Sequence, residues 1–221
     1  MRIYLHLSPN TEMVPFNYQQ SLVGAFHKWL GENQYHDDIS LYSLSWLHGG
    51  RLRRDKKGFE FRNGATFFIS APNEDLLKDL ISGIFKGAHI RWGMSVQEVR
   101  MRITPEFGNS QRFVAQSPIF IKRSRPDGDG HQFFFPSDTD ANAHLTETLQ
   151  RKLAIAGLST DVSVAFDPDY RNPNIKKIQF NNIDLKATFC PVIVQGDAEA
   201  VRFAWDVGVG NSTGIGFGSL R

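Results

Sequence analysis

The sequence predicts an α+β protein of two tandem ferredoxin-like domains, of which the second is irregular and ends in a glycine-rich loop. Over roughly the first hundred residues, apolar alternation typical of strands and the periodicity typical of helices give the order β-α-β-β-α-β, which is the ferredoxin-like unit. The second half repeats this pattern more loosely. A chain of 221 residues is long enough for two domains of about 100 residues each.

The first domain is expected at residues 1–108, and local sequence signals predict its helices and strands. Asn17, followed three residues later by Gln20, predicts a helix N-terminus, and Gly31 predicts the end of that helix. A stripe of leucine and isoleucine predicts a second helix, which Gly87 closes. In chain order we expect a strand at 2–7, a helix at 17–30, a strand at 41–47, a charged turn at 49–57, strands at 58–61 and 65–70, a helix at 73–86 and a strand at 90–103.

The second domain is expected at residues 109–221, after a turn-rich stretch at 105–110. The residues at 201–207 alternate and predict a strand that runs into the glycine-rich loop, so no second helix is expected in this domain. In chain order we expect strands at 113–121 and 132–135, a helix at 138–156 that ends at Gly157, and strands at 162–166, 175–180, 185–194 and 200–209.

The glycine-rich loop occupies the last fourteen residues, which contain five glycines. Without a Cβ, such a stretch can adopt positive φ and bring its amides close to a ligand, and a phosphate is the natural ligand for successive amides. The loop lacks the G-K-[ST] of a P-loop. A flexible tail is the alternative, but Ile215, Phe217 and Leu220 supply apolar anchors that a disordered tail would lack.

Basic residues gather in groups, although the net charge is only +2. A run of charge is as often a solvated turn as a binding site. Several basic turns on a small sheet protein nevertheless suggest a surface for a polyanion, whose binding would weaken with salt. No RNP1-type aromatic motif supports base stacking on an open sheet. The expected binding residues are Arg51, Arg53, Arg54, Lys56 and Lys57 in one group and Lys122 and Arg123 in another.

Several classes of protein are disfavoured by the composition. The single cysteine, Cys190, leaves no partner for an intrachain disulfide and suits a reducing cytosol, so a cytoplasmic protein is expected. No run of 18 apolar residues predicts a membrane span. No metal-binding motif, cofactor motif or G-x-S-x-G elbow is present, so we expect no metal, no cofactor and no hydrolase triad.

Two of the seven histidines are candidates for acid–base chemistry. On a helical wheel His27 lies away from the apolar stripe, beside small and polar residues such as Gly24, and His36 follows in a polar loop. Two imidazoles can share general base and general acid duties near neutral pH. The alternative, which the residues alone favour, is a surface histidine and a loop cap. His48 and His131 are weaker candidates.

Four stretches carry motifs that occur together in one known family. They are V-P-F-N-Y-Q-Q at 14–20, L-Y-S-L-S at 41–45, Q-S-P-I-F-I at 116–121 and V-G-V-G-N-S-T-G-I-G-F-G at 207–218. The last fits the pattern G-h-G-x(5)-G-h-G through Gly208, Gly210, Gly216 and Gly218. Together, and in this order along the whole chain, they resemble the CRISPR-associated repeat-processing endoribonucleases, the Cas6 family within the RAMP group of tandem ferredoxin-like proteins.

The resemblance implies metal-independent cleavage of CRISPR repeat RNA, in which the substrate's own 2′-OH attacks the adjacent phosphate. The products are a 2′,3′-cyclic phosphate and a 5′-OH. By motif position, His27 stands where some relatives have a catalytic tyrosine, and His36 where they have a histidine. The lysine of those relatives would fall at 38–40, where this chain has no basic residue. The basic group at 51–57 or an amide of the glycine-rich loop could take its role, while the four patterned glycines and the basic groups would bind RNA.

Two other classes of function stay open. A non-catalytic RAMP subunit would share the fold and the glycine-rich loop but only hold RNA in a CRISPR effector complex. A metabolic ferredoxin-like enzyme is less favoured, because no cofactor motif is present. The expected partners are CRISPR repeat RNA and other effector subunits, for a monomer or a homodimer that is not bound to a membrane.

Overall fold

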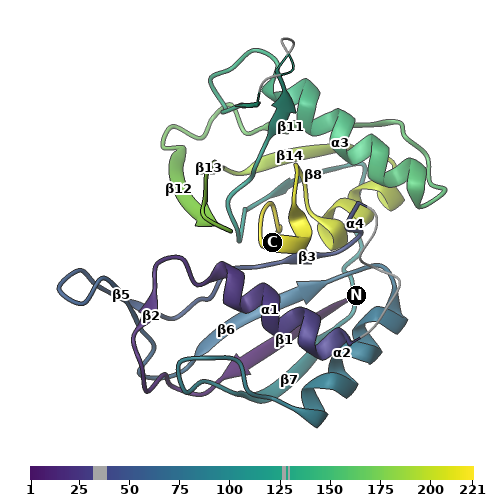
Figure 1. Ribbon diagram of the computed structural model, residues 1–221. Coiled ribbons are helices and arrows are strands. Elements are labelled where there is room, and N and C mark those ends of the chain that lie inside the picture. Colours follow the sequence, from purple (N-terminus) through teal and green to yellow (C-terminus); the bar gives the residue numbers. More distant parts are fainter. Residues whose placement is uncertain (32–38, 126–127, 129) are drawn as a thin grey trace.

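The structure is a computed structural model that describes residues 1–31, 39–125, 128 and 130–221. It consists of two α+β lobes stacked one above the other, with the C-terminal residues between them (Figure 1). The N-terminal lobe contains β1 to β7 with α1 and α2, and the C-terminal lobe contains the elements that follow. Within the described ranges, none of the helices combines the length and the apolar character needed to cross a membrane.

The N-terminal lobe has the expected β-α-β-β-α-β unit, with a small additional sheet. Its main sheet has the strand order β3-β6-β1-β7 and is antiparallel throughout, so that Ile3 of β1 lies opposite Ile69 on one side and Met101 on the other. A second sheet, β2-β5-β4, extends to the left in Figure 1. The elements are β1 (Arg2–Leu7), β2 (Val14–Pro15), α1 (Gln19–Leu30), β3 (Ser43–Leu44), β4 (Arg51–Arg53), β5 (Gly58–Glu60), β6 (Ala65–Ser70), α2 (Glu74–Lys86) and β7 (Val96–Arg102).

Different interactions determine where the two helices of the N-terminal lobe begin. The side chain of Asn73 accepts hydrogen bonds from the amides of Asp75 and Leu76 and so caps α2. The prediction that Asn17 caps α1 is wrong, because the residue before that helix is Tyr18, which makes no side-chain cap. Tyr18 is buried, and its hydroxyl accepts a hydrogen bond from the amide of Leu47. Packing of this ring, rather than a cap, therefore sets where α1 begins.

The C-terminal lobe is the irregular one. A three-stranded sheet, β11-β14-β8, packs against α3 and α4, while β9–β10 and β12–β13 form separate hairpins. The elements are β8 (Ser110–Phe113), β9 (Lys122–Ser124), β10 (His131–Phe133), α3 (Ala141–Ile155), β11 (Val162–Phe166), β12 (Asn174–Phe180), β13 (Ile183–Phe189), β14 (Val192–Gly196), α4 (Ala198–Val207) and the short 3₁₀ helix η1 (Thr213–Ile215). Each lobe has its own apolar core, and the division at residue 108 stays a prediction.

Three predictions for the C-terminal lobe are wrong. The strand expected at 113–121 is not formed, because β8 ends at Phe113 and β9 begins only at Lys122. The residues expected as a strand at 200–209 form α4, whose N-terminus is capped by the Asp197 side chain at 2.7 Å from the amide of Ala200. Since nearly every side of α4 is buried, apolar residues at 201, 203, 205 and 207 alternate as in a strand although the backbone is helical. The strand expected at 185–194 is two strands, because Cys190 and Pro191 separate β13 from β14.

A buried arginine joins the two lobes. Arg2, at the start of β1, is fully buried between the rings of Phe68 and Trp205, with its guanidinium carbon 3.7 Å and 3.4 Å from their centroids. Its Nη2 donates to the carbonyls of Trp205 and Leu220. A buried cation needs such partners, because desolvation without them is costly. The first strand is thus attached to α4 and to the C-terminal residues.

Candidate functional site

The glycine-rich segment, residues 208–218, lies buried between the lobes. Gly208, Gly210 and Gly218 have φ of +71°, +77° and +61°. A Cβ on Gly210 would come within 2.6 Å of the carbonyl oxygen of Phe120, and one on Gly218 would collide with that of Val209. Glycine is therefore required here by close approach of backbone to backbone.

Three of the patterned glycines already use their amides inside the protein. The amide of Gly208 donates to the carbonyl of Ala204 at 2.8 Å, and that of Gly218 to Pro118 at 2.9 Å. The amide of Gly216 donates to Thr213 at 3.3 Å. Their hydrogen bonds are made to the chain itself, and contact of Gly208, Gly216 and Gly218 with RNA stays a prediction. Contact between Gly210 and RNA stays a prediction.

The candidate histidine on α1 lies close to this segment. His27 is half-buried and packs beside the ring of Phe26, with centroids 5.1 Å apart. Phe26 in turn stacks on Tyr42 at 4.9 Å. A Cβ on Gly214 would lie 3.0 Å from the Tyr42 ring, and α1 itself packs against η1. The partial exposure expected for His27 is confirmed, and a line of aromatic contacts connects its neighbourhood to the glycine-rich segment.

His36 belongs to residues 32–38, which lie outside the described residues. The structure describes the residues on either side of this segment. Gly31 ends α1 as predicted, with its amide 3.0 Å from the carbonyl of His27. Ser40 lies against Gly214, because a Cβ there would collide with its Oγ. Gly31 therefore lies beside the His27 turn, and Ser40 lies at the glycine-rich segment.

A buried lysine that the sequence analysis missed lies on the other side of the glycine-rich segment. Lys152 of α3 is 2% exposed, and its Nζ donates to the carbonyl of Val207 at 3.0 Å and to Thr213 Oγ1 at 2.8 Å. Thr213 Oγ1 donates to the carbonyl of Tyr42 at 2.9 Å. Burial lowers the pKa of Lys152 to about 7. Its position three residues after Leu149, on the buried stripe of α3, was the available signal.

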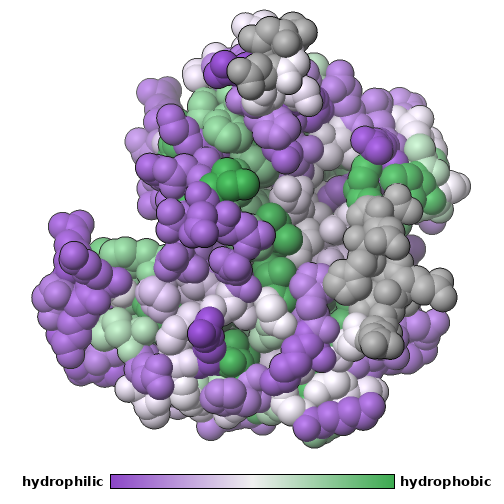
Figure 2. Space-filling view, in the orientation of Figure 1, coloured by the Kyte–Doolittle hydropathy of each residue, from purple (hydrophilic) through white to green (hydrophobic). Residues whose placement is uncertain are grey.

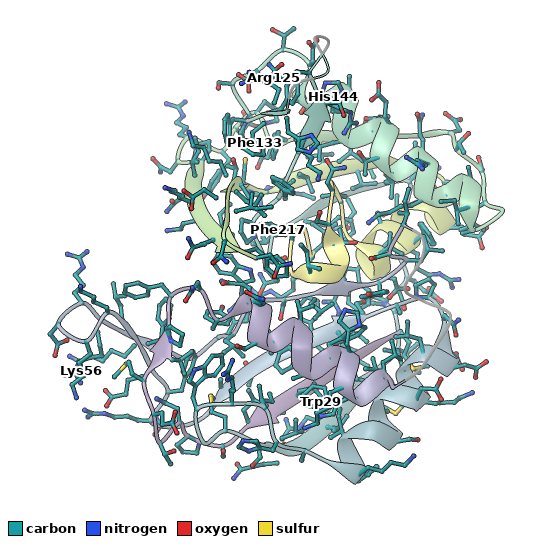
Figure 3. The ribbon with its side chains drawn as sticks, in the orientation of Figure 1. Trp29, Lys56, Arg125, Phe133, His144 and Phe217 are labelled. Atoms are coloured by element: carbon teal, nitrogen blue, oxygen red, sulfur yellow. The ribbon has the colours of Figure 1, made fainter. Side chains whose placement is uncertain are left out.

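The basic group at 51–57 forms an exposed hairpin, which we call the basic arm (β4, β5 and the turn between them). Its side chains cover a hydrophilic projection in Figure 2, and Lys56 extends from it in Figure 3. Arg53 is the exception, because it pairs with Asp55 at 2.9 Å and Glu60 at 3.1 Å. The cations open to a ligand are Arg51, Arg54, Lys56 and Lys57, which are exposed.

The second basic group lines a cavity of about 380 Å³ in the C-terminal lobe. Lys122, His131 and Arg151 contribute to its wall, together with Arg123, which pairs with Glu147 at 3.0 Å. Ile39 also lines it. The cavity therefore opens next to the point where the segment carrying His36 rejoins the described chain.

The weaker candidate His48 does not line the basic cavity. It borders a cavity of about 310 Å³ with Tyr18, Trp46 and Phe189. Partial burial and the nearby charge of Arg221 lower its pKa. His131 lies in the basic cavity, so the structure groups it with the binding residues.

Comparison with known proteins identifies the family. The family model described as CRISPR associated protein Cas6, C-terminal, matches residues 102–221, which is more than half of the chain. The chain belongs to the Cas6 family. The match includes the glycine-rich segment and the residues that line the basic cavity, except Ile39.

Relatives of the Cas6 family match along the full length. CRISPR-associated endoribonuclease Cas6 1 of Methanocaldococcus jannaschii is 23% identical over 236 residues, covering 100% of this chain and 92% of the relative. A solved structure described as a Cas6-related gene product from Pyrococcus furiosus aligns with a TM-score of 0.87 at 19% identity, covering 100% of this chain and 97% of that one. Another, described as an RAMP protein binding different RNA substrates, aligns at 0.83 and 19% identity, covering 100% and 98%. The tandem ferredoxin-like fold is thereby confirmed.

Proposed function

We propose that this Cas6 protein is an endoribonuclease that cleaves CRISPR repeat RNA by attack of the substrate's 2′-OH on the adjacent phosphate. The reaction needs a base for the 2′ proton, an acid for the departing 5′-oxygen and positive charge near the phosphorane. It leaves a 2′,3′-cyclic phosphate and a 5′-OH. The observation that carries the proposal is a half-buried histidine on α1, beside the glycine-rich segment, in a chain whose full-length relative is named an endoribonuclease.

His27 is assigned as the general base and His36 as the general acid. An imidazole at position 27 can take the 2′-OH proton near pH 7, since its ordinary pKa lies close to that value. Gly31, just before the segment that carries His36, donates its amide to the carbonyl of His27, which supports a shared site for the pair.

Positive charge is supplied by the basic cavity. Lys122 and Arg151 line it next to Ile39, and neither is ion-paired with a described residue, whereas Arg123 pairs with Glu147. The glycine amides are poor candidates for this role, because three of the four patterned ones are bonded internally. The basic arm is assigned to binding, since its cations project from the N-terminal lobe.

The deciding experiment is single-turnover cleavage of repeat RNA at saturating enzyme. His27→Ala should bind RNA nearly as well as wild type but cleave roughly 10²-fold more slowly or worse, the usual loss for a general acid or base. His36→Ala should show a similar loss. His89→Ala, an exposed histidine of the same lobe, is the matched control and should cleave normally. If His27→Ala cleaves within a few-fold of wild type while His48→Ala is inactive, the assignment of the base is wrong.

The route through the 2′-OH has its own test. Cleavage should persist in EDTA, and a single 2′-deoxy substitution at the scissile nucleotide should abolish it while leaving binding intact. Cleavage of the deoxy substrate would contradict the mechanism, and a cut that strictly requires magnesium would contradict its metal independence.

A non-catalytic RNA-binding role is the second candidate. The absence of a basic residue at 38–40 favours it, because the proposed charge must then come from the basic cavity. Tight binding of repeat RNA without any cleavage, in protein that retains both histidines, would select this role.

A further inference from the structure

The cavity that His48 borders is lined mainly by aromatic rings, and we call it the aromatic cavity. Its volume of about 310 Å³ is near the lower end of the ~300–1,000 Å³ that ligand pockets span. The rings come from both lobes and are those of Tyr18, Trp46, Phe59, Phe61 and Phe189. Figure 2 shows this face of the molecule hollowed between the projecting basic arm and the C-terminal lobe.

The rings that line the aromatic cavity are held in place. The indole nitrogen of Trp46 donates to the carbonyl of Gly216 at 2.9 Å, and the hydroxyl of Tyr18 accepts from the amide of Leu47 at 3.1 Å. The rings of Trp46 and Phe189 meet edge to face, with centroids 5.3 Å apart and planes at 89°. A wall of fixed rings loses little conformational freedom when a ligand binds, and it suits a flat aromatic ligand.

Two polar side chains also line the aromatic cavity, and none of the described residues in its wall is Lys, Arg, Asp or Glu. Gln116 uses little of its hydrogen-bonding capacity, because among the described residues its side chain bonds only to the carbonyl of Ala115, at 3.5 Å. His48 is fixed by two backbone bonds with Thr66, and partial burial and the charge of Arg221 lower its pKa. Its imidazole is then neutral at pH 7 and offers one donor and one acceptor. The wall therefore suits a neutral ligand with hydrogen-bonding groups on its edge.

Cations lie near the aromatic cavity in both lobes. Phe59 belongs to β5 of the basic arm, whose exposed cations include Arg51. In the C-terminal lobe, Lys176 lies two residues from Asn174, which pairs with Phe189, so Lys176 and Phe189 share one face of the β12–β13 hairpin. A neutral aromatic cavity with positive charge around it matches a nucleotide of a single strand, because the base is flat and neutral and the phosphates are anionic.

We propose that the aromatic cavity takes up one unpaired adenine base of the bound RNA and that Gln116 reads the edge of this base. A purine has the flat shape that the wall suits. A glutamine amide can pair its donor and its acceptor with the N6 amino group and the neighbouring ring nitrogen of adenine. Phe189 contributes stacking, and the basic arm binds the adjoining phosphates. The inference rests on the proposed function for the identity of its ligand, RNA, but it requires no cleavage.

An abasic scan of the repeat RNA tests the cavity. The RNA carries a 2′-deoxy substitution at the scissile nucleotide, so that only binding is measured, and each nucleotide in turn is replaced by an abasic one. We expect an adenosine at which loss of the base weakens binding roughly tenfold, the usual order for a stacked base. In Phe189→Leu the same replacement should cost little further. Phe85→Leu, at an exposed phenylalanine of α2, is the matched control and should keep the wild-type loss.

Gln116→Glu tests how the edge of that base is read. A carboxylate only accepts hydrogen bonds, so it repels the ring nitrogen of adenine but can accept from the N1–H and the N2 amino group of guanine. The variant should therefore bind RNA with adenine at this position roughly tenfold more weakly and should prefer guanine there. Gln111→Glu makes the same change at another half-buried glutamine of the C-terminal lobe, and it should keep the preference for adenine.

The outcomes decide between this inference and the proposed function. The inference is overturned if no abasic-sensitive adenosine is coupled to Phe189, if the coupled base is a pyrimidine, or if Gln116→Glu keeps the wild-type preference. Thermal unfolding checks that the variants fold, and the Gln116→Glu comparison decides alone if Phe189→Leu does not. Base selectivity in a protein that never cleaves RNA would contradict only the proposed function, whereas cleavage without a coupled adenosine would contradict only this inference.

Discussion

The glycine-rich segment and the basic arm carry the same expected role in the sequence, contact with RNA, but they have opposite environments. The segment is buried between the lobes, and its glycines are needed where backbone crosses backbone. The arm projects from the N-terminal lobe with four exposed cations. The difference shows that a motif specific to a family can be buried where backbone segments cross closely. We expect the phosphate contacts to be made by the exposed cations of the basic arm.

The largest effect should come from the glycine-rich segment. Gly218→Ala places a Cβ where the carbonyl of Val209 lies, so we expect loss of the folded state or a large fall in melting temperature. Gly216→Ala is the matched control, because its nearest neighbours, atoms of Trp46, are 3.9 Å away, and only the positive φ costs about 1 kcal/mol. Thermal unfolding of both variants measures the contrast. Equal stability of the two variants would mean that the glycine-rich segment is not held rigidly between the lobes.

The next effect is a dependence of stability on pH, and it also tests the packing around the glycine-rich segment. Lys152 binds its proton more weakly when folded, with a pKa of about 7, than when unfolded, near its ordinary 10.5. Unfolding therefore takes up a proton between these values. The free energy of unfolding should rise by about 2 kcal/mol as the pH increases from 7 to 9, since the slope reaches its full 1.36 kcal/mol per unit only above the folded-state pKa. Denaturant titrations at both pH values measure this rise. In Lys152→Met most of it should vanish, and an unchanged rise in that variant would assign it to other groups.

The smallest effect should come from the basic arm. Reversing the charges of Arg54 and Lys56 together should leave stability unchanged, weaken RNA binding roughly tenfold and flatten the salt dependence by roughly 0.7 for each phosphate that the arm no longer binds. Lys86 and Arg202, which are exposed on α2 and α4, provide a control with the same change in net charge. Binding isotherms at several salt concentrations measure both slopes. Equal losses of affinity in the two variants would show that only net charge matters and that the arm is not a binding surface.

Local signals predicted much of the fold, and tertiary packing explains the rest. The strands at 2–7, 65–70 and 162–166 have the expected bounds, because alternation is reliable where one face of a strand is buried. Alternation misled at α4, where burial on nearly all sides removed the helical periodicity. For the site, the sequence indicated a partly exposed His27 but not the buried Lys152. Its surroundings come from α4 and η1, more than fifty residues further along the chain, and no local pattern contains that information.

The bond from Arg2 to the carbonyl of Leu220 joins positions 218 residues apart in the chain. Closing a loop of that length carries an entropic cost that only the finished interface offsets, so contacts this distant slow folding. During synthesis the first strand leaves the ribosome long before α4 exists, and its guanidinium must stay in water until then. We therefore expect the N-terminal lobe to fold first as an incomplete unit, and the two lobes to pack together only after Trp205 and Leu220 have left the ribosome.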